Sequence, residues 1–246
     1  MRKIKYKKGR KVHPSNLEYT GIHKDTHTEM QMFVYDADEV VEFQQCEPHD
    51  LDTNIDNLKV NWINIHGLNN HTFIEKVGAK FDADYFIIGD ILNTTKRTRV
   101  EEYHNILFFN VKSLLPLKES DNISVEQISF LLKDNVLISF QEKRSDFFTH
   151  IRERIRTNSG VVRTKKADYL LYLLLDAIIE NFYITIESEE NKVDELIDLS
   201  KENTNPEVLA LIEKHRDNFN FLKVRNSSFN FLRISIYDYF INIITI

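Results

Sequence analysis

The sequence contains few of the residues that break or cross-link a chain. Its 246 residues include six glycines, four prolines and a single cysteine, Cys46. One cysteine excludes an intramolecular disulfide framework and fits a reducing compartment such as the cytoplasm. The scarcity of glycine and proline favours long helices and strands over a loop-rich or disordered chain.

Long apolar runs are also missing. The longest, Leu170 to Leu175, lies between Asp168 and Asp176, whereas a membrane-spanning helix needs about 20 apolar residues. Residues 1–12 are rich in Lys and Arg without the apolar core of a signal peptide, so we expect a disordered, solvated basic arm with no nucleic-acid partner. We expect none of the 246 residues to cross a membrane.

Motifs for catalysis are absent as well. There is no Gly-rich phosphate loop, no nucleophile elbow and no paired-cysteine zinc signature, so we expect no enzyme. Cys46 and His49 have a spacing that suits zinc, but a structural zinc site takes four ligands and a plain loop is favoured. A solvated polar turn is likewise favoured for four alternating residues, His23, Asp25, His27 and Glu29.

The first part of the chain shows the pattern of a layered α/β domain. Runs rich in β-branched and aromatic residues predict five strands, at Met30 to Tyr35, Val40 to Phe43, Val60 to Ile65, Ile106 to Val111 and Val136 to Phe140. Apolar residues at helical spacing predict helices at Asn70 to Phe81 and at Val125 to Leu132. We therefore expect a sheet with helices packed against it.

The pattern changes near residue 165. For about 60 residues the apolar spacing is that of a long helix, interrupted by Glu189 and Glu190. Asn205 and Pro206 are suited to the cap and first turn of a second helix, along which Val208 to Leu222 carry a further apolar stripe that includes His215. The surplus apolar surface predicts oligomerisation. Residues 229–246 fit either the start of an interface helix or a β-like end.

Several segments in order resemble the CorA family of magnesium transporters. Trp62 to Leu68 is similar to the family's strand-and-turn motif, and Phe73 to Phe81 to the helix after it. Asp90 to Tyr103 (DILNTTKRTRVEEY) resembles the central motif LEDILNTxQRPKxEEY. Further similar segments follow in the family order, at Glu126 to Phe130, Phe140 to Lys143, Ile151 to Arg156 and Asp168 to Ile178.

This resemblance implies a three-layer α/β/α sandwich with a mixed sheet, followed by long antiparallel stalk helices. It implies a sensor domain at 1–165 and, at 166–246, helices leading towards a transmembrane region that this chain lacks. In the complete protein, the family's arrangement is a homopentamer in the inner or plasma membrane, with this part on the cytoplasmic side. The Gly-Met-Asn pore signature is absent, so the chain itself is not expected to conduct ions.

The resemblance also implies metal ligands. Asp90 matches the acidic residue of one intersubunit site, and Asp176 that of a second. Bound Mg²⁺, with Co²⁺, Ca²⁺ or Zn²⁺ as possible replacements, is expected to hold the pore closed by offsetting repulsion between carboxylates of neighbouring subunits. Two structural alternatives remain open, namely that Asp90 caps a helix at Ile91 and that Asp176 is a paired core carboxylate.

The chain departs from the family pattern near Asp90. Gly89 replaces an acidic residue, Lys96 a glutamine and Thr98 a proline. Two other functions stay open beside the ion sensor: a free-standing interaction protein that reuses the fold, and the same domain of a zinc or cobalt transporter.

Overall fold

The computed structural model describes residues 17–116, 123–202 and 206–223. Within these residues the chain forms two compact units. The first contains the chain up to Val111 together with Gln127–Leu175, and the second contains Lys112–Glu126 and the chain from Asp176 onwards. Helix α5 (Ala167–Glu202) contributes to both units. A functional boundary near residue 165 stays a prediction. The basic arm and residues 229–246 lie outside the described residues.

A sheet of seven strands in the order β2-β1-β3-β7-β6-β5-β4 forms most of the first unit, while the end of β5 from Lys112 and the start of β6 up to Glu126 belong to the second. The central pair, β3 and β7, is parallel, and the pairs β1–β2, β1–β3, β6–β7 and β4–β5 are antiparallel, so the sheet is mixed as expected. The strands are β1 (Glu29–Tyr35), β2 (Val40–Phe43), β3 (Val60–His66), β4 (Arg99–Tyr103), β5 (Ile106–Pro116), β6 (Ile123–Lys133) and β7 (Val136–Gln141).

The helical segments are α1 (Leu51–Asn54), α2 (His71–Lys80), α3 (Tyr85–Leu92), α4 (Thr149–Arg156), α5 and a helix over residues 206–223, with short 3-10 turns η2 (Pro48–Asp50), η3 (Asp146–Phe148) and η4 (Val162–Thr164). All five predicted strands and the helix predicted at 70–81 are confirmed. The helix predicted at Val125 to Leu132 is wrong, because this segment is strand β6. Ile128 and Phe130 point to one face of the sheet and Ser129 and Leu131 to the other, and all are buried.

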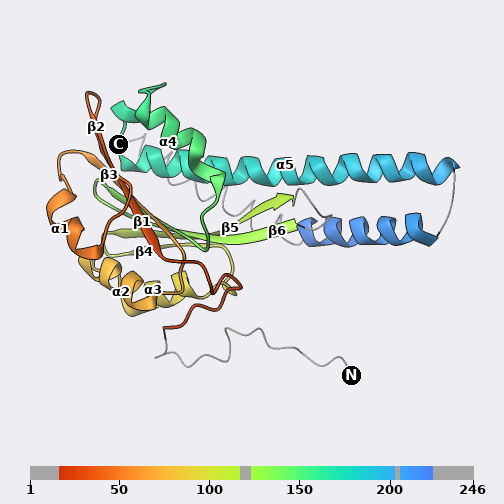
Figure 1. Cartoon of the computed structure of the whole chain (residues 1–246), viewed down its shortest axis with the longest axis horizontal. Helices are drawn as coiled ribbons and strands as arrows, with labels where there is room; N and C mark the ends of the chain where they lie inside the picture. Colours follow the sequence, from red (N-terminus) through yellow and green to blue (C-terminus); the bar gives the residue numbers. More distant parts are fainter. Residues whose placement is uncertain (1–16, 117–122, 203–205, 224–246) are drawn as a thin grey trace. The chain divides into compact units, whose positions relative to one another are not determined.

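One face of the sheet is covered by α2 and α3 (Figure 1). Met30 and Met32 of β1 and Ile63 and Ile65 of β3 belong to the same buried cluster as the apolar residues of these two helices, because alternate residues of a strand point to one face. Both helices begin with a side-chain cap. Asn70 accepts a hydrogen bond from the backbone N–H of Phe73, and Asp84 from that of Ile87.

The opposite face packs on α4 and the start of α5 (Figure 1). Trp62 of β3 stacks on Phe33 of β1 and contacts Phe148, which precedes α4. The Trp62 indole N–H donates to Ser139 Oγ at 2.9 Å, and the Ser139 hydroxyl donates to Asn64 Oδ1 at 2.8 Å. This face therefore has an aromatic centre that is linked to a strip of buried polar side chains.

In the second unit, the helix at 206–223 runs back beside α5 (Figure 1). Glu189 on α5 is 0% exposed and His215 on the second helix 2% exposed, and His215 Nδ1 lies 2.8 Å from Glu189 Oε2. Asn218 Nδ2 donates to the same oxygen at 2.9 Å, and Lys192 Nζ to Oε1 at 3.2 Å. The two helices are thus joined by a buried polar cluster at the point where Glu189 interrupts the apolar stripe. The predicted cap, Asn205, lies outside the described residues.

By length and composition alone, Ala167–Lys201 is long and apolar enough to cross a membrane, and half of its most apolar window is buried inside the protein. A core helix of a soluble protein meets the same criteria. The helix therefore gives only weak support for a membrane span.

Candidate functional site

Asp90 lies in the last turn of α3, on the side of the helix that faces the protein. Ile87, Ile88, Ile91 and Leu92 of the same helix are buried, and Asp90 itself is only 5% exposed. The alternative that Asp90 caps a helix is wrong, because Asp90 lies within α3, whose N-terminal cap is Asp84.

The carboxylate of Asp90 is paired with two cations from the motif that follows it. Lys96 Nζ lies 2.8 Å from Oδ1, and the Arg99 guanidinium contacts Oδ2. Arg99 also pairs with Glu101 at 2.8 Å and lies over the ring of Phe108. A buried carboxylate needs such partners, since an unpaired charge away from water is very costly.

Two amides hold the backbone at the end of α3. Asn110 Nδ2 donates to the carbonyl oxygen of Asp90 at 3.2 Å, and Gln127 Nε2 donates to those of Asp90 and Ile91 at 3.1 Å. The last carbonyl groups of a helix lack partners within the helix. Strands β5 and β6 thereby fix the position of Asp90.

Gly89 precedes this carboxylate and is half-buried. A methyl group added at its Cα would lie 3.7 Å from Leu17 Cδ2, which is ordinary van der Waals contact. The described neighbours therefore do not require glycine at this position.

Asp176 is exposed on α5, which contradicts its interpretation as a core carboxylate. It belongs to the second compact unit, whereas Asp90 belongs to the first. Neither residue is in a group of three or more His, Cys, Asp or Glu side chains that could hold a metal ion, as far as the described ranges extend.

The remaining candidate ligands do not form a metal site among the described residues. Cys46 is buried, and burial, followed by the nearby charge of Asp50, raises the pKa of its thiol to about 11. His49 is exposed and lies 3.3 Å from the Asp50 carboxylate. Glu29, from the alternating group at 23–29, lies on β1 and pairs instead with Arg144 at 3.4 Å.

Comparison with known proteins decides the family. A model of the family described as CorA-like Mg²⁺ transporter protein matches residues 57–236. The chain belongs to the CorA family. It is 32% identical over 228 residues to the cobalt/magnesium transport protein CorA of Thermotoga maritima, and the match covers 92% of this chain and 63% of that protein. The chain thus spans less than two thirds of the length of this relative.

Solved structures show the same fold at low identity. The soluble domain of CorA from Methanocaldococcus jannaschii is 14% identical, with a TM-score of 0.56, and the match covers 84% of this chain and 95% of that one. For the ZntB cytoplasmic domain from Vibrio parahaemolyticus the identity is 14% and the TM-score 0.53, with 85% and 88% covered. The expected fold class is confirmed. The CorA family is one of membrane transporters and not of enzymes.

Proposed function

We propose that this CorA-family chain is the regulatory domain of a divalent-cation transporter, on the cytoplasmic side of the membrane. In this proposal Mg²⁺, the substrate, also binds between neighbouring copies and favours the closed pore. The family match over residues 57–236 carries the proposal, since it includes the centre of the sheet and both long helices. Co²⁺ is the second candidate ion, because the Thermotoga relative is named as a transport protein for cobalt and magnesium.

Self-association is part of the proposal, with a homopentamer as the expected assembly. The helices of the second unit expose large apolar side chains that a monomer leaves in water. These are Tyr183, Ile184, Ile197 and Leu199 on α5 and Leu209 and Leu211 on the following helix. Their exposure supports a partner surface supplied by another copy.

The two proposed metal ligands differ in how a cation would reach them. Asp176 is exposed on α5, and Mg²⁺ typically keeps several waters and takes one or two carboxylates from protein. Asp90 faces Lys96 and Arg99, so a cation has to displace both side chains before it can bind there. We therefore propose that a hydrated cation binds at the exposed Asp176 and that a cation at Asp90 competes with Lys96 and Arg99.

The test uses this domain joined to the membrane spans of a CorA relative, reconstituted in vesicles that contain a Mg²⁺ indicator. We expect influx to stop as internal Mg²⁺ rises, and Asp176→Asn to need more Mg²⁺ for the same inhibition. Asp198→Asn is the matched control, since Asp198 is an exposed carboxylate further along α5. Influx with an unchanged inhibition curve in Asp176→Asn would refute the sensing role without affecting the transport role.

Asp90 is tested by removing its competitor. Lys96→Gln restores the family residue and leaves Arg99 as the one cation of the described pair, so we expect lower concentrations of Mg²⁺ to stop influx. Replacing Mg²⁺ by Co²⁺ or Zn²⁺ in the same assay identifies the regulatory ion. An inhibition curve that does not move in Lys96→Gln would exclude competition at Asp90.

A further inference from the structure

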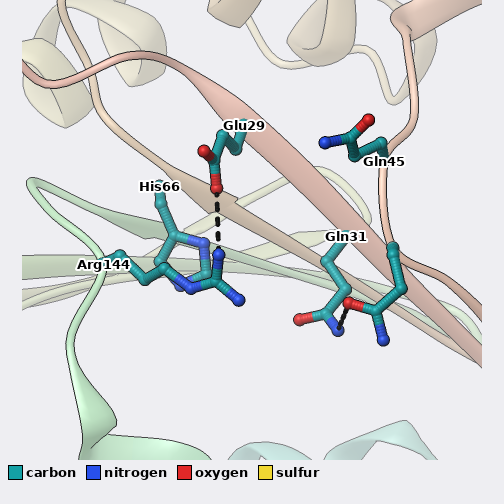
Figure 2. Close-up of a pocket in the computed structure, with 6 residues that line it drawn as sticks. Glu29, Gln31, Gln45, His66 and Arg144 are labelled. Carbon is teal, nitrogen blue, oxygen red and sulfur yellow. Dashed lines mark hydrogen bonds and ion pairs between the residues drawn. The ribbon is translucent and has the colours of Figure 1, made fainter.

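A polar pocket of about 240 Å³ lies at one end of the sheet face that packs on α4, entirely within the first unit. Figure 2 shows the side chains that line it. They are Glu29, Gln31, Gln44, Gln45, His66 and Arg144. His66 and Gln31 are buried and form the floor. Glu29 is half-buried and Gln44, Gln45 and Arg144 are exposed, and these four form the rim. No described residue of the proposed metal sites contributes to it.

The two sides of the pocket differ in chemistry (Figure 2). On one side Arg144 pairs with Glu29 across 3.4 Å, and the Arg144 side chain is 72% exposed. An ion pair that is long and exposed contributes little stability. Either side chain can therefore exchange its partner for a charged group of a ligand at small cost.

The other side is made of amides. Gln31 Nε2 donates to Gln44 Oε1 at 3.2 Å and to Glu42 Oε1 at 2.6 Å, and in Figure 2 the oxygen of the Gln31 amide points towards His66 and Arg144. Gln45 completes this side of the rim. Amides supply both donors and acceptors without net charge, which suits a polar, uncharged part of a ligand.

The floor adds a neutral imidazole. Burial, followed by the positive charges of Arg152 and Arg144, lowers the pKa of His66 to about 4. At neutral pH the ring has one N–H donor and one acceptor nitrogen. The pocket therefore has one formal positive and one formal negative charge, both on its rim, above a polar uncharged floor.

The volume limits the size of the ligand. Sites for drug-sized molecules usually measure about 300–1,000 Å³, and this pocket is smaller. Nucleotides are too large for it, and a single ion would fill only a small part of it. We propose that the pocket binds a small zwitterion of the size of a free amino acid, whose carboxylate pairs with Arg144 and whose ammonium group pairs with Glu29.

The test is calorimetric titration of the 246-residue chain, with a chelator present so that metal binding does not contribute. Three probes of nearly equal shape separate the two charges. L-asparagine carries a carboxylate, an ammonium group and an amide, succinamate lacks the ammonium group, and 3-aminopropanamide lacks the carboxylate. We expect L-asparagine to bind with a Kd below about 1 mM and each of the other two at least about tenfold more weakly.

Two variants assign the charges, and both change rim residues. Arg144→Gln should weaken L-asparagine and succinamate by about tenfold and leave 3-aminopropanamide unchanged. Glu29→Gln should weaken L-asparagine and 3-aminopropanamide and leave succinamate unchanged. Arg97→Gln is the matched control, because Arg97 is exposed and lies just before β4, at the opposite edge of the sheet from β2.

Two results would overturn the assignment. One is the absence of saturable L-asparagine binding to the unaltered chain. The other is that binding of all three probes is weakened equally in either variant. That result would mean that the side chain supports the fold and does not pair with a charged group of the ligand.

Discussion

Replacing His215 by leucine is expected to loosen the pair of helices in the second unit. The substitution removes the partner 2.8 Å from Glu189 Oε2 and leaves a carboxylate that is 0% exposed with Asn218 and Lys192 alone. A hydrogen bond to a charged group contributes about 1.5–3 kcal/mol, and breaking a buried pair costs about 3–5 kcal/mol. Because two donors remain, we expect the loss of local stability to lie towards the lower of these values, at about 2 kcal/mol.

Amide hydrogen exchange measured by mass spectrometry is suited to this change, because it reports the opening of one region separately from the rest. A loss of 2 kcal/mol corresponds to about thirtyfold faster exchange in peptides around residues 189 and 215. Peptides from β1 and β3 serve as the internal control, since they belong to the first unit. We expect their exchange to be unchanged.

The double variant Glu189→Leu with His215→Leu decides whether the pair itself is responsible. Removing both partners leaves no buried unpaired carboxylate, so much of the lost protection should return. The exchange rates give the loss of local stability in each variant. If the loss in the double variant equals the sum of the losses in the two single variants, the two residues are not coupled and the reasoning is wrong.

The same cluster makes the helices sensitive to acid. Burial favours the neutral form of Glu189, but hydrogen bonds from His215, Asn218 and Lys192 outweigh it and hold the pKa of this carboxyl below its ordinary value of 4.5. Such a group stabilises the fold above its unfolded-state pKa, and the contribution is lost as pH falls through the folded-state pKa. After correction for intrinsic rates, protection around residue 189 should therefore decrease below about pH 4.5, and less so in the double variant.

Two further changes concern the first unit. In Gly21→Ala the new methyl group would collide with the Tyr19 hydroxyl and the Glu142 carboxylate, which hydrogen-bond to each other, so urea denaturation should show a loss of about 1–3 kcal/mol; an unchanged midpoint would mean that the segment shifts freely. The Cys46 thiol, with its pKa raised to about 11, should react with iodoacetamide at pH 8 at least about tenfold more slowly than in the urea-unfolded chain. Equal rates would show that the thiol is accessible and unperturbed.

Sequence alone predicts the β1, β2, β3 and β7 strands well, because each is a compact β-branched or aromatic run. The prediction fails at β6. Ile128 and Leu132 have helical spacing, but they also fit a strand that is buried on both faces. A short apolar run has no clear period, so the sequence does not distinguish the two. Strand β4 (Arg99–Tyr103) was not predicted either, because three of its five residues are charged. It lies at the edge of the sheet, where charged side chains are common.

The environment of Asp90 could be predicted only in part. The central motif identifies the family and the residue, but it cannot show that Lys96 and Arg99 fold back onto the carboxylate. Similarly, the sequence shows that Glu189 interrupts an apolar stripe, whereas its pairing with His215 depends on how two helices align in space. Contacts between residues far apart in sequence are set by the tertiary fold, and no local pattern determines them.

The parallel pairing of β3 with β7 has a consequence for synthesis on the ribosome. Asn61 pairs with Val136, about 75 residues later in the chain. At about 5–20 residues per second, β3 emerges roughly 4–15 s before the strand that covers its open side. During that interval the nascent β1–β3 ribbon presents a bare, apolar strand edge, the kind of surface that pairs with other chains. Chaperone binding to this ribbon would protect the nascent protein until β7 arrives.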